Sequence, residues 1–205
     1  MATQRLGSAH SGWATTVWVD PGGTTGWGVV SVLPQFLTTT KPITAKSVEH
    51  WACGESKKNE DQMASEMLEL FDVWDDAAIG IERFHLRQMA VELSPVSVTA
   101  KIEYGLWLME KWEADEEDRE VGRPRMVFKQ EPSLAKRTLT DDRQRETGFW
   151  VPGADHKRDA IKHCVTFLQR AQEKPRLRAT AWPHLYKIDG SLLKRLPPTS
   201  KRGKY

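Results

Sequence analysis

Cysteine is scarce in this sequence, and long hydrophobic runs are absent. The two cysteines, Cys53 and Cys164, are too few for a disulfide framework and lack the spacing of metal ligands. No stretch approaches the length of a membrane-spanning helix, and the N-terminus lacks the charged-then-apolar pattern of a signal peptide. These absences predict a cytoplasmic protein with reduced thiols and no membrane partner.

The sequence is rich in charge but almost neutral overall. Its 205 residues are 39% hydrophobic and 28% charged, which predicts one soluble domain with a substantial core. The net charge of +2 conceals an uneven distribution, because residues 169–205 hold ten Lys or Arg against two acids. This excess predicts either a polyanionic partner or merely a solubilising tail.

Composition divides the chain into three parts. Residues 1–15 are small and polar, which predicts a disordered N-terminal arm. Residues 16–172 alternate strand-like and helix-like patterns, as expected for an α/β domain. Residues 173–205 form a basic C-terminal tail, and its prolines predict an extended conformation.

The stretch from Thr16 to Val30 predicts two strands joined by a tight turn. Its apolar run Val17-Trp18-Val19 is typical of a strand buried on both faces of a sheet. Asp20 follows that run, and Pro21-Gly22-Gly23 ends the strand. A carboxylate in this position either holds a cation or bonds its own backbone in a hairpin turn.

A second acid ends another predicted strand. The segment Ala78–Phe84 has alternating buried positions and carries Glu82 near its end. Taken alone, Glu82 is more typical of a surface residue. The loop that follows contains Arg83, Phe84, His85 and Arg87, a combination suited to gripping phosphates and stacking on bases.

A late helix supplies two further candidate ligands. It is predicted to begin at Asp155 or His156 and to run to about Gln172, with His156 and Asp159 on one face of its first turn. Carboxylates are the hard ligands that Mg²⁺ prefers, and imidazole also suits Mn²⁺. With Asp20 and Glu82, these residues predict a divalent-metal site, although an acidic first turn also has a simple helix-dipole explanation.

These motifs, in this order, resemble the RuvC-type Holliday junction resolvases of the RNase H-like superfamily. Among those, the sequence is most similar to the resolvases encoded by mycobacteriophages. The resemblance covers residues 16–172 and includes Pro132–Thr140, which is similar to a family helix carrying a lysine, here Lys136. It implies an RNase H-like fold, a mixed sheet of about five strands flanked by helices.

The resemblance also implies a function and a site. Four-way DNA junctions are the implied substrate, with flaps and forks as open alternatives, and a homodimer would cut the two strands symmetrically. Two Mg²⁺ ions, replaceable by Mn²⁺, would be held by Asp20, Glu82 and Asp159, with His156 or Asp155 as a fourth group. Lys136 would contact the reacting phosphate, and DNA contacts would come from Arg83, Phe84, His85, Arg87, Lys136 and Arg137. Removing residues 176–205 is then expected to weaken DNA binding without affecting cleavage.

The sequence departs from the family pattern in two places. A second lysine is usual soon after the first, but Thr140–Thr147 offers only Arg143 and Arg145. The aromatic residue expected a few positions past the acid is here Phe84, closer than usual, with His85 in the later position. Two alternatives stay open: a branched-DNA-binding protein of this fold without activity, and an actin-like nucleotide-binding protein suggested by Asp-x-Gly-x-Thr-Thr at residues 20–25.

Overall fold

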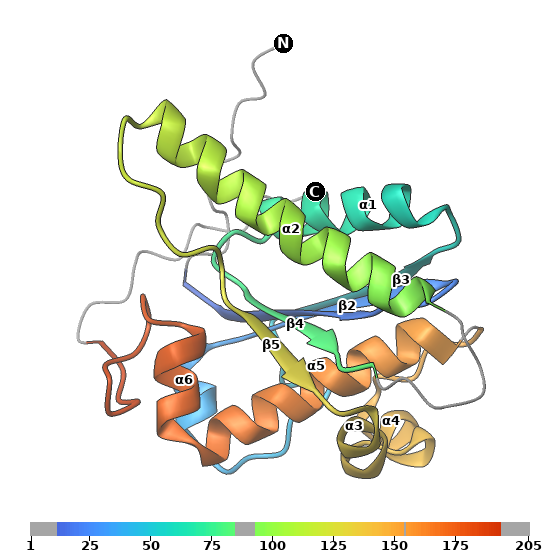
Figure 1. Ribbon diagram of the computed structural model, residues 1–205. Coiled ribbons are helices and arrows are strands. Elements are labelled where there is room, and N and C mark those ends of the chain that lie inside the picture. Colours follow the sequence, from blue (N-terminus) through green and yellow to red (C-terminus); the bar gives the residue numbers. More distant parts are fainter. Residues whose placement is uncertain (1–11, 85–92, 154, 194–205) are drawn as a thin grey trace, which may run out of the picture.

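A mixed five-stranded sheet forms the centre of the protein, as seen in the computed structural model (Figure 1). The structure describes residues 12–84, 93–153 and 155–193. The strands lie in the order β3-β2-β1-β4-β5, and their bounds are Ala14–Asp20 (β1), Thr25–Val32 (β2), His50–Ser56 (β3), Ala78–Glu82 (β4) and Val127–Gln130 (β5). Strands β1, β2 and β3 pair antiparallel, whereas β4 runs parallel to both β1 and β5.

Helices cover both faces of this sheet. Their bounds are Pro34–Thr38 (η1, a 3₁₀ helix), Glu60–Val73 (α1), Ser94–Glu116 (α2), Pro132–Thr138 (α3), Asp141–Thr147 (α4), Asp155–Glu173 (α5) and Pro175–Ala181 (α6). Helices α1 and α2 lie on one face, and α5 crosses the other with α3, α4 and α6 beside it (Figure 1). The strand order, strand polarity and helical layers confirm the predicted RNase H-like α/β fold.

The alternation of side chains along β1 explains this layering. Val17 and Val19 point into a core with the apolar sides of α1 and α2, while Trp18 points into the core beneath α5. All three are essentially inaccessible to solvent, so the predicted strand buried on both faces is confirmed. Ala14 and Thr15, assigned to the N-terminal arm from the sequence, instead belong to β1.

The segment after α5 corrects the sequence interpretation. Residues 175–181 form helix α6, and Trp182, Leu185 and Tyr186 are buried in the core beneath α5. The prediction that the chain is extended from residue 173 is therefore wrong for this part. Arg178 shows how this basic segment can pack in the core. Its side chain is buried and donates hydrogen bonds to the carbonyls of four residues, Leu37, Ala171, Gln172 and Gly190. A cation satisfied in this way can enter a core.

Helix α2 has an inner and an outer side. Val98 and Ile102 are buried against α1, and Gly105 allows α1 to approach so closely that a Cβ there would lie 2.3 Å from Leu68. This side of α2 is thus packed within the chain. Trp112, by contrast, is 61% exposed. In the part of the chain that the structure describes, no helix is both long and apolar enough to cross a membrane.

Candidate active site

Two acids meet at one edge of the sheet because their strands are parallel neighbours. Val19 pairs with Ile81, and Asp20 and Glu82 are the next residues on β1 and β4. Each is the last residue of its strand, so both carboxylates project from the same carboxyl-terminal edge. Asp20 is 8% exposed, and the side chain of Glu82 is 17% exposed. The structure therefore places these two strand-end acids on neighbouring strands at one edge of the sheet.

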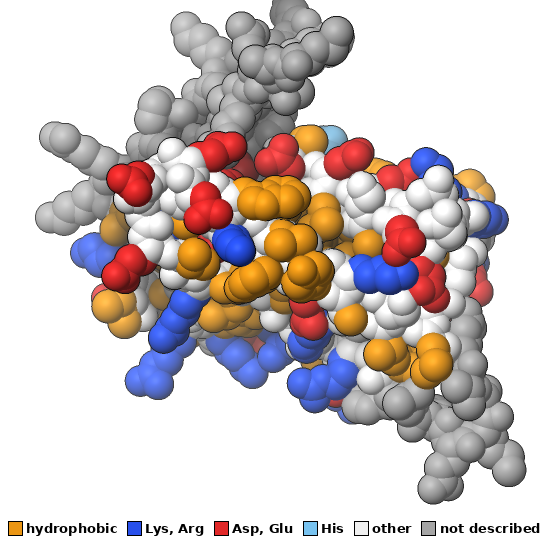
Figure 2. Space-filling model, turned by 45° about the horizontal axis from the view of Figure 1, so that its top comes forward, with side chains coloured by type: hydrophobic (Ala, Val, Ile, Leu, Met, Phe, Trp, Pro, Cys, Tyr) orange, Lys and Arg blue, Asp and Glu red, His pale blue; other side chains and the backbone are white. Residues whose placement is uncertain are grey.

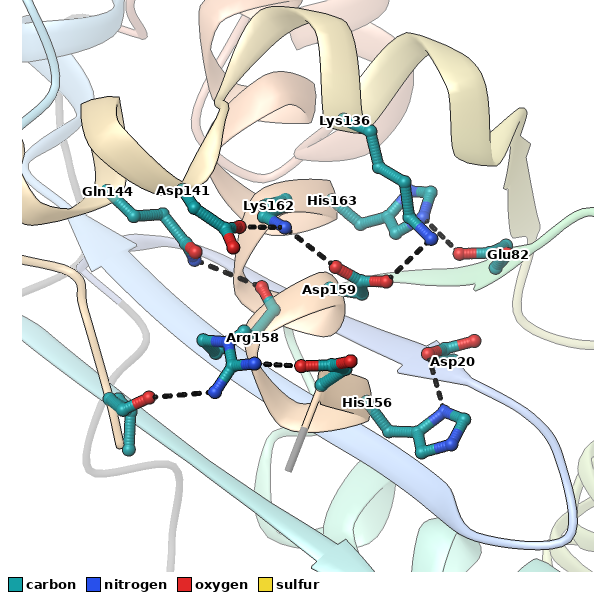
Figure 3. Close-up of polar contacts among 12 residues, drawn as sticks. Asp20, Glu82, Lys136, Asp141, Gln144, His156, Arg158, Asp159, Lys162 and His163 are labelled. Carbon is teal, nitrogen blue, oxygen red and sulfur yellow. Dashed lines mark hydrogen bonds and ion pairs between the residues drawn. The ribbon is translucent and has the colours of Figure 1, made fainter. Parts of the chain in front are cut away.

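Glycines in β2 bring the start of α5 against this edge. A Cβ at Gly26 would lie 2.3 Å from the backbone of His156, and one at Gly28 would lie 3.1 Å from the backbone of Ala160. Both glycines face α5, since residues two apart in a strand share a face. The close approach places His156 Nδ1 3.0 Å from Asp20 Oδ2 (Figure 3).

Asp159 completes the group of acids, and two lysines bind it. Lys136 Nζ of α3 lies 2.8 Å from Asp159 Oδ2, and Lys162 Nζ of α5 lies 2.9 Å from Asp159 Oδ1. Lys162 also contacts Asp141 Oδ1 of α4 at 2.7 Å. In Figure 3, the carboxylates of Asp20, Glu82 and Asp159 face a common space. Lys136 reaches into that space from α3, on the side away from Asp20.

The site's pKa shifts reflect burial and these close charges. Burial raises the pKa of Asp20, with the nearby Glu82 and Asp159 carboxylates adding to the effect and His156 opposing it. Burial also works against ionisation of Asp159, but hydrogen bonds from Lys136 and Lys162 outweigh it and lower the pKa of that carboxyl. The hydrogen bond to Asp20 raises the pKa of His156. The charges of Glu82, Asp159 and His156 therefore all act on Asp20.

The hydrogen bond with Asp159 raises the pKa of Lys136, and the carboxylates of Glu82 and Asp20 contribute to that shift. Its side chain is 55% exposed, so the ammonium group lies between the acids and solvent. Lys162, with 8% of its side chain exposed, is enclosed by its two carboxylates. The two lysines thus differ in position: Lys136 is open to solvent, whereas Lys162 supports Asp159 from inside.

The chemistry of this donor set fits a hard divalent cation. With His156 neutral, the four carboxylates of Asp20, Glu82, Asp141 and Asp159 would exceed the two ammonium groups by two negative charges. A divalent ion would balance that excess, and carboxylate oxygens are its preferred ligands. Within the described ranges, no three His, Cys, Asp or Glu side chains already form a cluster that could hold a metal ion. Both carboxylate oxygens of Asp159 are instead in contact with the ammonium groups of Lys136 and Lys162. Ion binding would therefore replace the contact from Lys136.

The structure distinguishes His156 from Asp155. The Asp155 side chain is 79% exposed and forms an ion pair with Arg158, which stacks on Trp150 with its guanidinium carbon 4.6 Å from the ring centroid. Asp155 is thus turned away from the carboxylates, while His156 bonds Asp20. Of the two alternatives left open by the sequence, His156 is the one that the fold brings into the site.

The predicted DNA contacts are placed only in part. Arg83 is exposed and pairs with Glu131 at 3.1 Å, and Phe84, two residues after the end of β4, is 40% exposed. Lys136 and Arg137 lie on the exposed side of α3. His85 and Arg87 lie outside the described residues.

Two site residues were missed from the sequence. Lys162 holds Asp159, and the fully buried His163 places its Nε2 2.6 Å from Glu82 Oε2. A signal was present, because His156, Asp159 and His163 follow the spacing i, i+3, i+7 that keeps residues on one helical face. Their neighbours Ile161, Cys164 and Val165 made the middle of α5 look purely apolar.

Comparisons with known proteins bear on the fold only. No protein-family model matches the sequence, and no curated protein matches it. Similar solved structures include RuvC of Thermus thermophilus in complex with Holliday junction substrate, with 15% identity, a TM-score of 0.49 and coverage of 78% of this chain and 96% of that one. A second T. thermophilus RuvC structure has 16% identity, the same TM-score and the same coverage. The strand order and the acids at the sheet edge define the class from the structure itself: an α/β domain with a mixed five-stranded sheet and a carboxylate-rich site.

Proposed function

We propose that this protein is a metal-dependent endonuclease that cuts branched DNA, chiefly four-way junctions. The observation that carries the proposal is that Asp20 and Glu82 end neighbouring parallel strands and that Asp159 of α5 lies near enough to raise the pKa of Asp20, with the solvent-facing Lys136 bound to Asp159. An excess of negative charge there would repel a phosphate, so the site needs a divalent cation before nucleic acid can approach.

The four groups Asp20, Glu82, His156 and Asp159 would hold two Mg²⁺ ions, or Mn²⁺ in their place. Bound ions would supply activation of a water and stabilisation of charge on the phosphate. The reaction is hydrolysis: the water oxygen bonds to phosphorus, the bond to the 3′ oxygen breaks, and that oxygen receives a proton. Lys136 is open to solvent, so its ammonium can turn from Asp159 to an incoming phosphate and offset the developing negative charge.

Recognition of DNA is assigned to the surface around this edge. Arg83 and Phe84 follow β4 directly, so they would meet the strands next to the scissile phosphate through charge and base stacking. Arg137 extends the same basic surface along α3. His85 and Arg87 remain predicted contacts from the sequence.

We propose that the outer side of α2 binds a second copy of this protein. Tyr104 and Trp107 are 60% and 40% exposed, and their rings stack with centroids 5.7 Å apart. Figure 2, viewed from the side of α1 and α2, shows hydrophobic side chains gathered between charged ones. A four-way junction needs symmetric cuts, and a two-fold dimer supplies them. Trp107→Glu should lower the sedimenting mass from dimer to monomer, whereas Ile188→Glu, at a 91% exposed position, should not.

The proposed activity is tested with purified full-length protein and labelled four-way junction, flap and linear duplex, each with Mg²⁺ or with EDTA. The proposal predicts cleavage of the junction in Mg²⁺, none in EDTA and little cleavage of linear duplex. Junction binding without cleavage in any divalent metal would instead identify a non-catalytic branched-DNA-binding protein. Failure to bind the junction would reject the proposal.

A further inference from the structure

His163 connects the acidic site to the interior of the protein. It is completely buried in α5, and its ring stacks on Trp18 with a centroid separation of 5.3 Å and an interplanar angle of 15°. One ring nitrogen, Nε2, lies 2.6 Å from Glu82 Oε2. The other, Nδ1, lies 2.9 Å from the side-chain nitrogen of Gln130. Both polar atoms of the imidazole therefore have one defined partner each.

The partners determine which nitrogen carries the proton. The amide nitrogen of Gln130 can only donate, so Nδ1 of His163 accepts and the ring proton resides on Nε2. That proton is donated to the Glu82 carboxylate. The orientation of the Gln130 amide is set in turn by Arg170, whose Nη1 lies 3.4 Å from Gln130 Oε1, since a guanidinium can only donate.

The four residues follow from the fold. Glu82 and Gln130 are paired neighbours at the ends of β4 and β5, so their side chains leave the sheet together. His163 and Arg170 are seven residues apart on α5, which places them on one face of the helix. The fold thus lines up Arg170, Gln130, His163 and Glu82, each donating a hydrogen bond to the next.

We propose that this chain of donors positions Glu82, with His163 as the residue that holds one carboxylate oxygen and leaves the carboxylate aimed at the cation. The inference rests on the proposed function, because it takes Glu82 to be a ligand. Buried hydrogen-bond partners of metal ligands commonly contribute tenfold to a hundredfold to metal affinity. Arg170, the first donor of this hydrogen-bonded series, can only donate. It therefore fixes the orientation of the hydrogen bonds from Gln130 to His163 and from His163 to Glu82.

Two substitutions of His163 separate positioning from packing. In His163→Gln, the amide nitrogen lies near the position of Nε2 and can still donate to Glu82. In His163→Asn, the shorter amide lies near the position of Nδ1 and cannot reach Glu82. Both variants lose the imidazole ring and its stacking on Trp18, so both should lose similar stability in thermal unfolding.

The first measurement needs no metal and no activity. Nitrogen-15 NMR of the histidine-labelled, full-length protein in EDTA at about pH 8, above the ordinary histidine pKa, reports which nitrogen of His163 carries the proton. The His163 signals are assigned in the unaltered protein by through-space contacts of its ring protons with Trp18, on which the ring stacks. The proposal predicts a protonated Nε2 and an unprotonated Nδ1. A proton on Nδ1 would overturn it, even if neither variant folds.

The second measurement is Mn²⁺ affinity, followed by electron paramagnetic resonance of the free ion. The expected result is a loss of about tenfold or more in His163→Asn and a change of less than about threefold in His163→Gln. Equal affinities in the two variants would overturn the positioning role while leaving the proposed function intact. Absence of Mn²⁺ binding by the unaltered protein would instead reject the metal site itself, and with it both proposals.

Discussion

Trp182 offers a direct test of whether the segment after α5 belongs to the folded domain. Its side chain is fully buried, its ring meets Phe167 at a centroid separation of 5.8 Å, and its Nε1 donates to the carbonyl of Thr15 at 2.7 Å. Trp182→Ala removes a large side chain from the core, at a cost of about 3–5 kcal/mol. The lost hydrogen bond to β1 adds about 1 kcal/mol, so we expect a total loss of about 4–6 kcal/mol.

That loss is a large part of the 5–15 kcal/mol by which domains are usually stable. Trp182→Phe is the matched control, because it keeps a buried aromatic ring while removing the donor and part of the indole, with an expected loss of about 1–3 kcal/mol. Urea unfolding followed by far-ultraviolet circular dichroism is the suitable assay, since tryptophan fluorescence changes with the substitution itself. A Trp182→Ala variant within about 1 kcal/mol of the unaltered protein would refute burial of this segment.

Three further predictions concern the approach of α5, the basic terminus and pH. Gly26→Ala should disrupt both folding and metal binding, because its Cβ would lie 2.3 Å from the His156 backbone; unchanged thermal stability would contradict this packing. Deleting residues 194–205 removes five Lys or Arg and no acid, so duplex binding should weaken. The slope of the log binding constant against log salt concentration should become shallower by about 0.9 per lost phosphate contact. Equal slopes would show that these cations do not contact DNA. Burial lowers the pKa of His50 below 6.5, so the unfolded chain binds more protons there and stability should fall as pH drops through 6.5. His50→Gln should reduce that dependence in urea titrations, and an unchanged pH profile would exclude His50 as its source.

The acids were predictable because they lie at strand ends. Asp20 and Glu82 each follow a short apolar run, and the fold that the family resemblance implied makes their strands neighbours, which brings such ends together. Asp159 was predictable from helical spacing. The choice between His156 and Asp155 was not, because adjacent helix positions differ by a rotation that only packing determines. Here Gly26 admits the His156 backbone, and Arg158 draws Asp155 outward.

The prediction for the C-terminal segment was wrong because the sequence shows its positive charges but not the backbone carbonyls that bind Arg178. Ten cations suggested a solvated tail, yet Arg178 is satisfied by backbone carbonyls and Trp182 and Tyr186 are buried beside it. Deleting residues 176–205 therefore removes part of the core, and the expectation that cleavage survives this deletion is withdrawn. Lys162 and His163 were overlooked for the opposite reason, since apolar neighbours concealed two polar residues whose partners come from α4, β4 and β5.

The measurement that tests the account most directly is cleavage of a labelled four-way junction in Mg²⁺ by the unaltered protein and by Asp20→Asn, Glu82→Gln and Asp159→Asn. Each substitution removes a negative charge and keeps the side-chain shape, so junction binding should stay within a few-fold of the unaltered protein. Cleavage should be lost in all three and in the unaltered protein with EDTA. Near-normal turnover by any one variant would show that its carboxylate is not part of the site, and cleavage in EDTA would contradict a metal-dependent nuclease altogether.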